Sequence, residues 1–189
     1  MSVSFKGYFI QQADYQHWAN EVLFAALDRL DDGARQADQG LAYGSPHHTV
    51  DHMLAAVRAW FNRLQGAEGE ADSGAPLCPE WQALKNELRH ELRGLQRWLE
   101  GMPEGYFDER VFYAIGGERQ SLWVRDALTQ LMTHLSFCRG QATAAATRLG
   151  LAAPEADYVR YKREMEQHIA HLREAEEERR ARPAAEPPQ

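Results

Sequence analysis

The stretch LWVRDALTQLMTHLSFCRGQATAAATRL, residues 122–149, decides the fold class of this chain. Small and apolar side chains recur along it at steps of three and four residues. The stripe comprises Val124, Ala127, Leu131, His134, Cys138, Ala142, Ala145 and Leu149. This spacing, close to a heptad, predicts one long amphipathic helix whose stripe faces a core. Gly150 follows as a helix stop signal.

Three more amphipathic segments precede this helix, at residues 5–30, 46–65 and 80–101. Their apolar residues recur at helical spacing, and turn formers separate the segments. Gly33 follows the first segment, and Ser45 before Pro46 fits the start of the second. Residues 66–79, rich in Gly, Ala, Ser, Glu and Pro, are typical of a mobile surface loop. A fifth helix is predicted from Pro154 to about Arg182.

One place in the chain favours strand structure. Val111–Ile115 precede Gly116 and Gly117, and paired glycines supply the positive φ of a tight hairpin turn. The sequence therefore predicts an all-α four-helix bundle, with a short β-hairpin before the helix over 122–149 and a fifth, C-terminal helix. Residues 1–172 are expected to form one domain, and the charged residues 173–189 a disordered tail.

Composition excludes several classes of protein. At 189 residues the chain fits one domain, and its net charge of -7 argues against general binding of nucleic acids. No apolar run approaches the ~20 residues of a membrane span, and no secretory signal is visible, so we expect a cytoplasmic protein that does not enter membranes. Cys78 and Cys138 are expected to be thiols, or one thiol and one metal ligand.

The pair His134 and Cys138 lies one helical turn apart on the stripe, so both side chains point at one spot. Imidazole and thiolate are zinc ligands, and a third ligand would come from another helix. His52 is the best candidate, whereas His47 and His48 are expected to face solvent or cap their helix. From spacing alone, a metal site is less favoured than ordinary core packing, in which the histidine lies next to a small buried thiol.

Several motifs, taken together and in this order, resemble the DinB family. They are Tyr15–Asn20 (YQHWAN), Gly44–His52 (GSPHHTVDH), Trp60, His134–Gln141 (HLSFCRGQ) and Asp157–Val159 (DYV). The resemblance covers about residues 5–161. It implies an up-down-down-up bundle, often a homodimer, with a divalent metal such as zinc or nickel held by three histidines. His52 and His134 match two of those ligands, and Cys138 stands at the third.

The cysteine is a departure from the family pattern. A thiolate is a softer ligand than imidazole, so the site is either kept with a changed metal preference or lost. Arg139, the next residue, is expected to pair with an acidic neighbour.

The resemblance implies a metal-dependent thiol transferase, in which His52, His134 and Cys138 hold the metal. A low-molecular-weight thiol and a small electrophile would be its substrates, and no general base is assigned. Two alternatives stay open. One is a non-catalytic helical, dimeric module that has kept the bundle and lost the metal site. The other is a metal-assisted hydrolase, ranked lower because no Asp or Glu stands at helical spacing beside His134 or Cys138.

Overall fold

The structure is a computed structural model that describes residues 4–67 and 76–181. These residues form six α-helices, one short 3-10 helix and one hairpin. The elements in chain order are α1 (Phe5–Leu27), α2 (Asp32–Gln36), α3 (Pro46–Leu64), α4 (Trp81–Gly101), η1 (Glu104–Asp108), β1 (Arg110–Ile115), β2 (Glu118–Trp123), α5 (Val124–Arg148) and α6 (Tyr158–Ala181).

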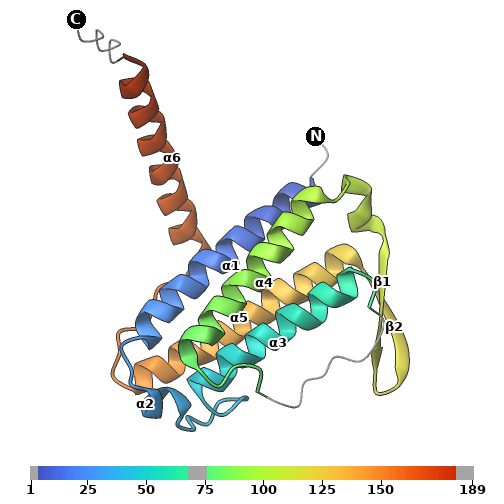
Figure 1. Ribbon diagram of the computed structural model, residues 1–189, viewed down its shortest axis with the longest axis vertical. Coiled ribbons are helices and arrows are strands. Elements are labelled where there is room, and N and C mark those ends of the chain that lie inside the picture. The colour runs from blue at the N-terminus through green and yellow to red at the C-terminus, as the bar shows by residue number, and fades with distance from the viewer. Residues whose placement is uncertain (1–3, 68–75, 182–189) are drawn as a thin grey trace, which may run out of the picture.

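Helices α1, α3, α4 and α5 form a four-helix bundle. Each of them packs against two of the others: α1 and α3 both lie between α4 and α5. Figure 1 shows α1 and α5 running in one direction and α3 and α4 in the other. The chain therefore follows the up-down-down-up order that the sequence resemblance implied, and the expected all-α class is confirmed.

The core lies where the heptad-like stripes predict it. On α5, all members of the predicted stripe are buried except His134, which is partly exposed, and Leu149, which lies just beyond the helix. On α4, five leucines from Leu84 to Leu99 follow one stripe and are fully buried. Burying each such side chain contributes about 2 kcal/mol, so these stripes hold the bundle together.

Side-chain caps set the starts of two helices, of which the start at Ser45 and Pro46 was expected. The Ser45 side chain accepts a hydrogen bond from His48 N, and Pro46 occupies the first turn of α3. Glu80 caps α4 in the same way, one residue before Trp81. The first helix ends at Leu27 rather than near Leu30, and the short α2 follows, capped by Asp31.

The predicted hairpin is present. β1 pairs with β2 in antiparallel register, and Gly116 and Gly117 at the turn have φ of 59° and 80°. Positive φ at both central residues matches the right-handed twist of the strands. The ring of Tyr113 on β1 lies 5.5 Å from that of Trp60, which fastens the hairpin to α3.

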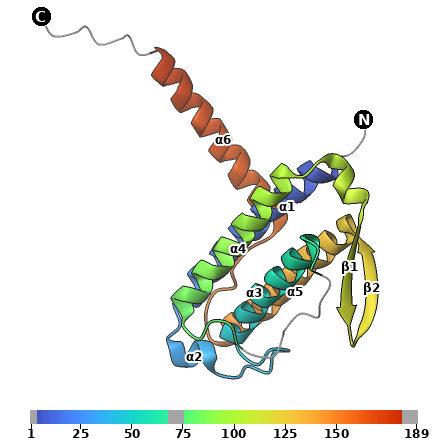
Figure 2. The same cartoon turned by 45° about the vertical axis from the view of Figure 1, so that its right-hand side comes forward.

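Helix α6 leaves the bundle and projects away from it (Figures 1 and 2). It begins at Tyr158, after an Asp157 side chain that accepts from Arg160 N, and it continues to Ala181, past the predicted domain end at residue 172. Most of the predicted loop, residues 68–75, and the last part of the predicted tail, residues 182–189, lie outside the described residues. Of the described helices, none combines the length and the apolar character that crossing a membrane requires.

Candidate metal centre

The three residues predicted as metal ligands meet between α3 and α5. His52 lies in the second turn of α3, and His134 and Cys138 are one turn apart on α5. Their ligand atoms all lie within 4.8 Å of one another. The two Nε2 atoms of the histidines are 2.9 Å apart, and Cys138 Sγ is 3.6 Å from Nε2 of His134. The packing of two helices therefore assembles a His–His–Cys cluster.

One of the three separations in the cluster matches a tetrahedral ion. Bonds of about 2.1 Å to nitrogen and about 2.3 Å to sulfur place N and S about 3.6 Å apart at the tetrahedral angle. The distance from Cys138 Sγ to His134 Nε2 has this value. Two nitrogens would stand about 3.4 Å apart. The 2.9 Å between the imidazoles is the shorter distance of a direct hydrogen bond, in which one ring donates and the other accepts. The remaining separation, between Cys138 Sγ and His52, is at most 4.8 Å. An ion would therefore need the two imidazoles to move about half an ångström apart and the sulfur to lie within about 3.6 Å of His52 as well.

The cluster is closed on one side and open on another. The Cys138 thiol is completely buried, whereas both imidazoles are partly exposed. The ring of Tyr43 stacks on His52 with centroids 3.7 Å apart and an angle of 16° between the planes. An ion held here would have sulfur on its inner side and a free position toward solvent, which is the arrangement of catalytic rather than structural zinc sites.

Gln141 holds the loop that carries Tyr43. Its side-chain oxygen accepts a hydrogen bond of 3.0 Å from Ala42 N. Gly44 has φ of 77°, and its N–H donates to Leu41 O, which closes the turn around Tyr43. Only a residue that tolerates positive φ fits there. Gln141 of the Arg-Gly-Gln motif thus contacts the loop whose Tyr43 stacks on His52, and it is linked to the cluster only through that loop.

Burial changes the proton affinity of all three groups. It lowers the pKa of His52, with repulsion from His134 adding to the effect, and it lowers the pKa of His134. It raises the pKa of the Cys138 thiol to about 11, against the opposing charge of Arg139. At neutral pH both imidazoles are therefore free bases ready to bind a metal, while the sulfur keeps its proton until an ion displaces it.

Within the part of the chain that the structure describes, Arg139 pairs with no acidic side chain, contrary to the expectation from the sequence. The residue is 4% exposed, and its guanidinium donates to Gln16 Oε1 at 2.5 Å, Asn20 Oδ1 at 3.0 Å and Ser136 Oγ at 3.0 Å. The prediction was wrong because the periodicity of α5 does not reveal which groups α1 brings opposite it. The contact joins two of the family motifs, the Trp-Ala-Asn of α1 and the Arg-Gly-Gln of α5.

His47 also differs from its prediction, whereas His48 is exposed as expected. His47 is buried and donates from Nε2 to the backbone oxygen of Cys78 at 2.9 Å. The carboxylate of Asp51, one turn further on, accepts hydrogen bonds from Leu77 N and Cys78 N. Together they anchor the segment that leads into α4. The sequence signal was a histidine and an aspartate one helical turn apart at the start of a helix, and this spacing does not indicate which segment they bind.

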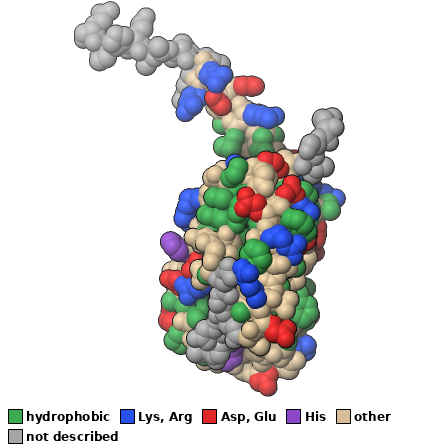
Figure 3. Space-filling view, turned by 90° about the vertical axis from the view of Figure 1, so that its right-hand side faces the viewer, with side chains coloured by type: hydrophobic (Ala, Val, Ile, Leu, Met, Phe, Trp, Pro, Cys, Tyr) green, Lys and Arg blue, Asp and Glu red, His purple; other side chains and the backbone are tan. Residues whose placement is uncertain are grey.

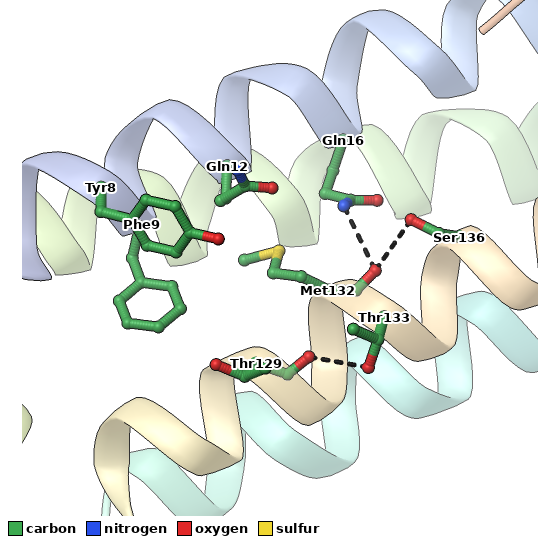
Figure 4. Close-up of a pocket in the computed structure, with 8 residues that line it drawn as sticks. All are labelled: Tyr8, Phe9, Gln12, Gln16, Thr129, Met132, Thr133 and Ser136. Carbon is green, nitrogen blue, oxygen red and sulfur yellow. Dashed lines mark hydrogen bonds between the residues drawn. The ribbon is translucent and has the colours of Figure 1, made fainter. Parts of the chain in front are cut away.

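A cavity of about 310 Å³ lies on the other side of α5, between that helix and α1 (Figure 4). It is lined by Tyr8, Phe9, Gln12, Gln16, Thr129, Met132, Thr133 and Ser136. The hydroxyls of Thr133 and Ser136 donate to backbone oxygens of their own helix. None of the lining side chains is a usual metal ligand, so the cluster between α3 and α5 remains the candidate centre.

The family comparison agrees with this geometry. The model of the DinB family matches residues 1–180, nearly the whole chain. No curated protein matches the sequence. With an up-down-down-up bundle, a cluster between α3 and α5 that could hold a divalent metal, and a match over this length, the chain belongs to the DinB family.

Proposed function

We propose that this protein binds one divalent transition-metal ion, zinc or nickel, through His52, His134 and Cys138, and transfers a low-molecular-weight thiol to a small electrophile. The observation that carries the proposal is the convergence of three ligand atoms within 4.8 Å on a DinB-family bundle. Soft thiolate and imidazole ligands suit zinc better than magnesium or calcium.

The surrounding residues fit this chemistry. A bound ion would act as a Lewis acid that lowers the pKa of an incoming thiol. Tyr43 holds the His52 ring in place by stacking, and the partly exposed imidazoles leave room for a substrate on the solvent side. Among the described residues no Asp or Glu joins the cluster, and Asp51 is occupied by the backbone of residues 77–78. Thiol transfer needs no such base, which favours it over hydrolysis.

Metal binding is tested with the two cysteines as matched variants. Metal-free protein is titrated with Co²⁺, which reports sulfur ligation by a near-ultraviolet charge-transfer absorption. We expect one ion per chain and this absorption in the wild type and in Cys78→Ser, since Cys78 lies outside the cluster. Cys138→Ser should lose the absorption. If it keeps the band, or if the wild type binds no stoichiometric ion, the site is not the one proposed.

Thiol transfer is then tested on the zinc- and nickel-loaded protein. A small thiol and chlorodinitrobenzene react by forming a sulfur–carbon bond, releasing chloride and passing the thiol proton to the buffer. We expect the loaded wild type to accelerate product formation and His52→Ala to lose the acceleration. Binding of metal without any acceleration, over a set of thiols and electrophiles, would reject the transferase and keep the metal site.

A second function has an observation of its own. The direct hydrogen bond between His52 and His134 gives the Nε2 atom of each ring a partner without a metal. This contact favours a non-catalytic helical module in which the cluster is a structural remnant. A melting temperature that is the same with and without chelator would support that alternative and contradict the metal site.

A further inference from the structure

The apolar stripe of α6 continues past the bundle. Its first members, Tyr158 and Tyr161, pack on the ring of Tyr15, which anchors the start of the helix to α1. The same stripe then carries Met165, Ile169 and Leu172 at steps of three and four residues. Ile169 is 48% exposed and Leu172 56% exposed, in the part of α6 that projects into solvent (Figure 2).

Charges of alternating sign border one side of this stripe. Lys162, Glu166, Arg173 and Glu177 project within a narrow angle on that flank. Glu166, Arg173 and Glu177 are exposed, and within residues 4–67 and 76–181 none of the four forms an ion pair. By contrast, Arg160 pairs with Glu164 elsewhere on the helix. Four unpaired charges thus flank an uncovered apolar stripe.

We propose that α6 pairs with α6 of a second copy of this chain in antiparallel orientation, with the two-fold axis beside Ile169. In this register Lys162 faces Glu177 of the partner subunit, and Glu166 faces Arg173 of the partner subunit. The midpoint of each pair along the helix lies within one residue of Ile169. The apolar pair of Met165 with Leu172 of the partner subunit has almost the same midpoint. The apolar and the charged contacts therefore favour one register.

The charge pattern selects this occupant over others. A parallel pair would set Glu166 and Arg173 against the opposite flank of the partner, where Ala175 is uncharged and Glu164 already pairs with Arg160 of its own helix. An anionic membrane surface would be met by a flank rich in lysine and arginine, whereas this flank has equal numbers of both signs. Figure 3 shows acidic and basic side chains interspersed on the projecting helix as well as on the bundle.

Glu166 and Arg173 are exposed on the part of α6 that projects from the bundle (Figure 2), so substitutions there should leave the bundle intact. The contact is short, and we expect a reversible monomer–dimer equilibrium rather than an obligate dimer. It is independent of the metal cluster, which lies between α3 and α5. All measurements are therefore made on the full chain in the presence of chelator.

Sedimentation velocity at increasing protein concentration tests the proposal with a charge swap. Glu166→Arg and Arg173→Glu each place like charges opposite one another twice in the dimer, and each should weaken dimerisation about fivefold or more at low salt. The double variant exchanges the two charges and should restore the wild-type equilibrium. A wild type that stays monomeric, single variants without effect, or a double variant as weak as the singles would each overturn the antiparallel contact.

A cross-link checks the register. In a Cys78→Ser background, Ile169→Cys places two thiols at the two-fold axis, so mild oxidation should yield a covalent dimer. Ala175→Cys, near the far end, should not cross-link, because antiparallel pairing separates its two copies. Equal cross-linking of both variants would indicate a parallel pair and reject the proposal.

Discussion

Cys138 changes the charge of the cluster as well as its shape. Three neutral imidazoles leave a divalent ion with its full charge, whereas a thiolate neutralises half of it. The sulfur lies at the inner end of the cluster, completely buried, with the buried guanidinium of Arg139 as the next residue. Burial raises the pKa of the thiol to about 11. The proton on this sulfur is therefore the main competitor of a metal ion.

Metal affinity should consequently rise with pH. The thiol is protonated below its pKa of about 11, while the lowered pKa values of His52 and His134 leave both imidazoles free above neutrality. Binding then releases one proton, and affinity should increase about tenfold per pH unit between about pH 7 and 10. Competition with a chelator of known affinity measures the slope. Cys138→His should give a nearly flat profile over the same range, and an equally flat wild type would exclude the thiolate as a ligand.

Arg139 stabilises the contact between α5 and α1 through neutral acceptors. Arg139→Leu would leave Gln16 Oε1 and Asn20 Oδ1 buried without this donor. Removing a charged donor while its buried acceptors remain is costly, because those acceptors lose their hydrogen-bond partner. We therefore expect a loss of about 3 kcal/mol in the free energy of unfolding. Urea denaturation measures it. Arg163→Leu, an exposed arginine on α6, is the control and should change stability by less than about 0.5 kcal/mol. A comparably small loss at Arg139 would mean that water replaces the guanidinium.

At the scale of whole elements, periodicity predicted the long helices and their buried faces, because burial of one stripe follows directly from spacing. The paired glycines predicted the hairpin for an equally local reason. Helix α2 was missed because five residues are too few to show a period. His47 and Arg139 were misplaced because their partners come from distant segments, at Cys78 and on α1. Spacing paired His134 with Cys138, whereas the resemblance supplied the match of His52 to a ligand position, because the periodicity of its helix alone does not select it.

The pairing of α1 with α4 contains a histidine that makes stability depend on pH. Burial and the nearby charge of Arg93 lower the pKa of His17 below 6.5, against opposing carboxylates. The unfolded chain then takes up a proton before the folded one does as pH falls, so stability is lost from about pH 7 downward. The melting temperature should fall less in His17→Gln than in the wild type between about pH 7.5 and 5.5. His168→Gln, on an exposed part of α6, should keep the wild-type fall. If all three proteins lose the same amount, His17 is not perturbed by folding.

At the scale of the whole molecule, polar contacts tie the bundle helices together pair by pair. The cluster joins α3 to α5, Arg139 joins α5 to α1, and the ion pair of Lys85 with Asp28 joins α4 to the end of α1. Arg58 joins α3 to α4 through Glu87 and Glu91. A metal bound at the cluster would therefore add one cross-link to a ring of four helices. The unfolded chain lacks this cross-link.

Metal binding should accordingly stabilise the entire bundle. An ion present at about a hundredfold excess over its dissociation constant adds about 2.7 kcal/mol if it does not bind the unfolded chain. For a chain of this size that raises the melting temperature by roughly 5–10 °C. Differential scanning fluorimetry with zinc, with nickel and with chelator measures the shift. Cys78→Ser should show the full effect and Cys138→Ser most of it lost, because only the second removes a ligand. A shift that is equal in both variants would place the ion elsewhere on the chain, and no shift in the wild type would leave a helical bundle whose cluster is held by its own hydrogen bond.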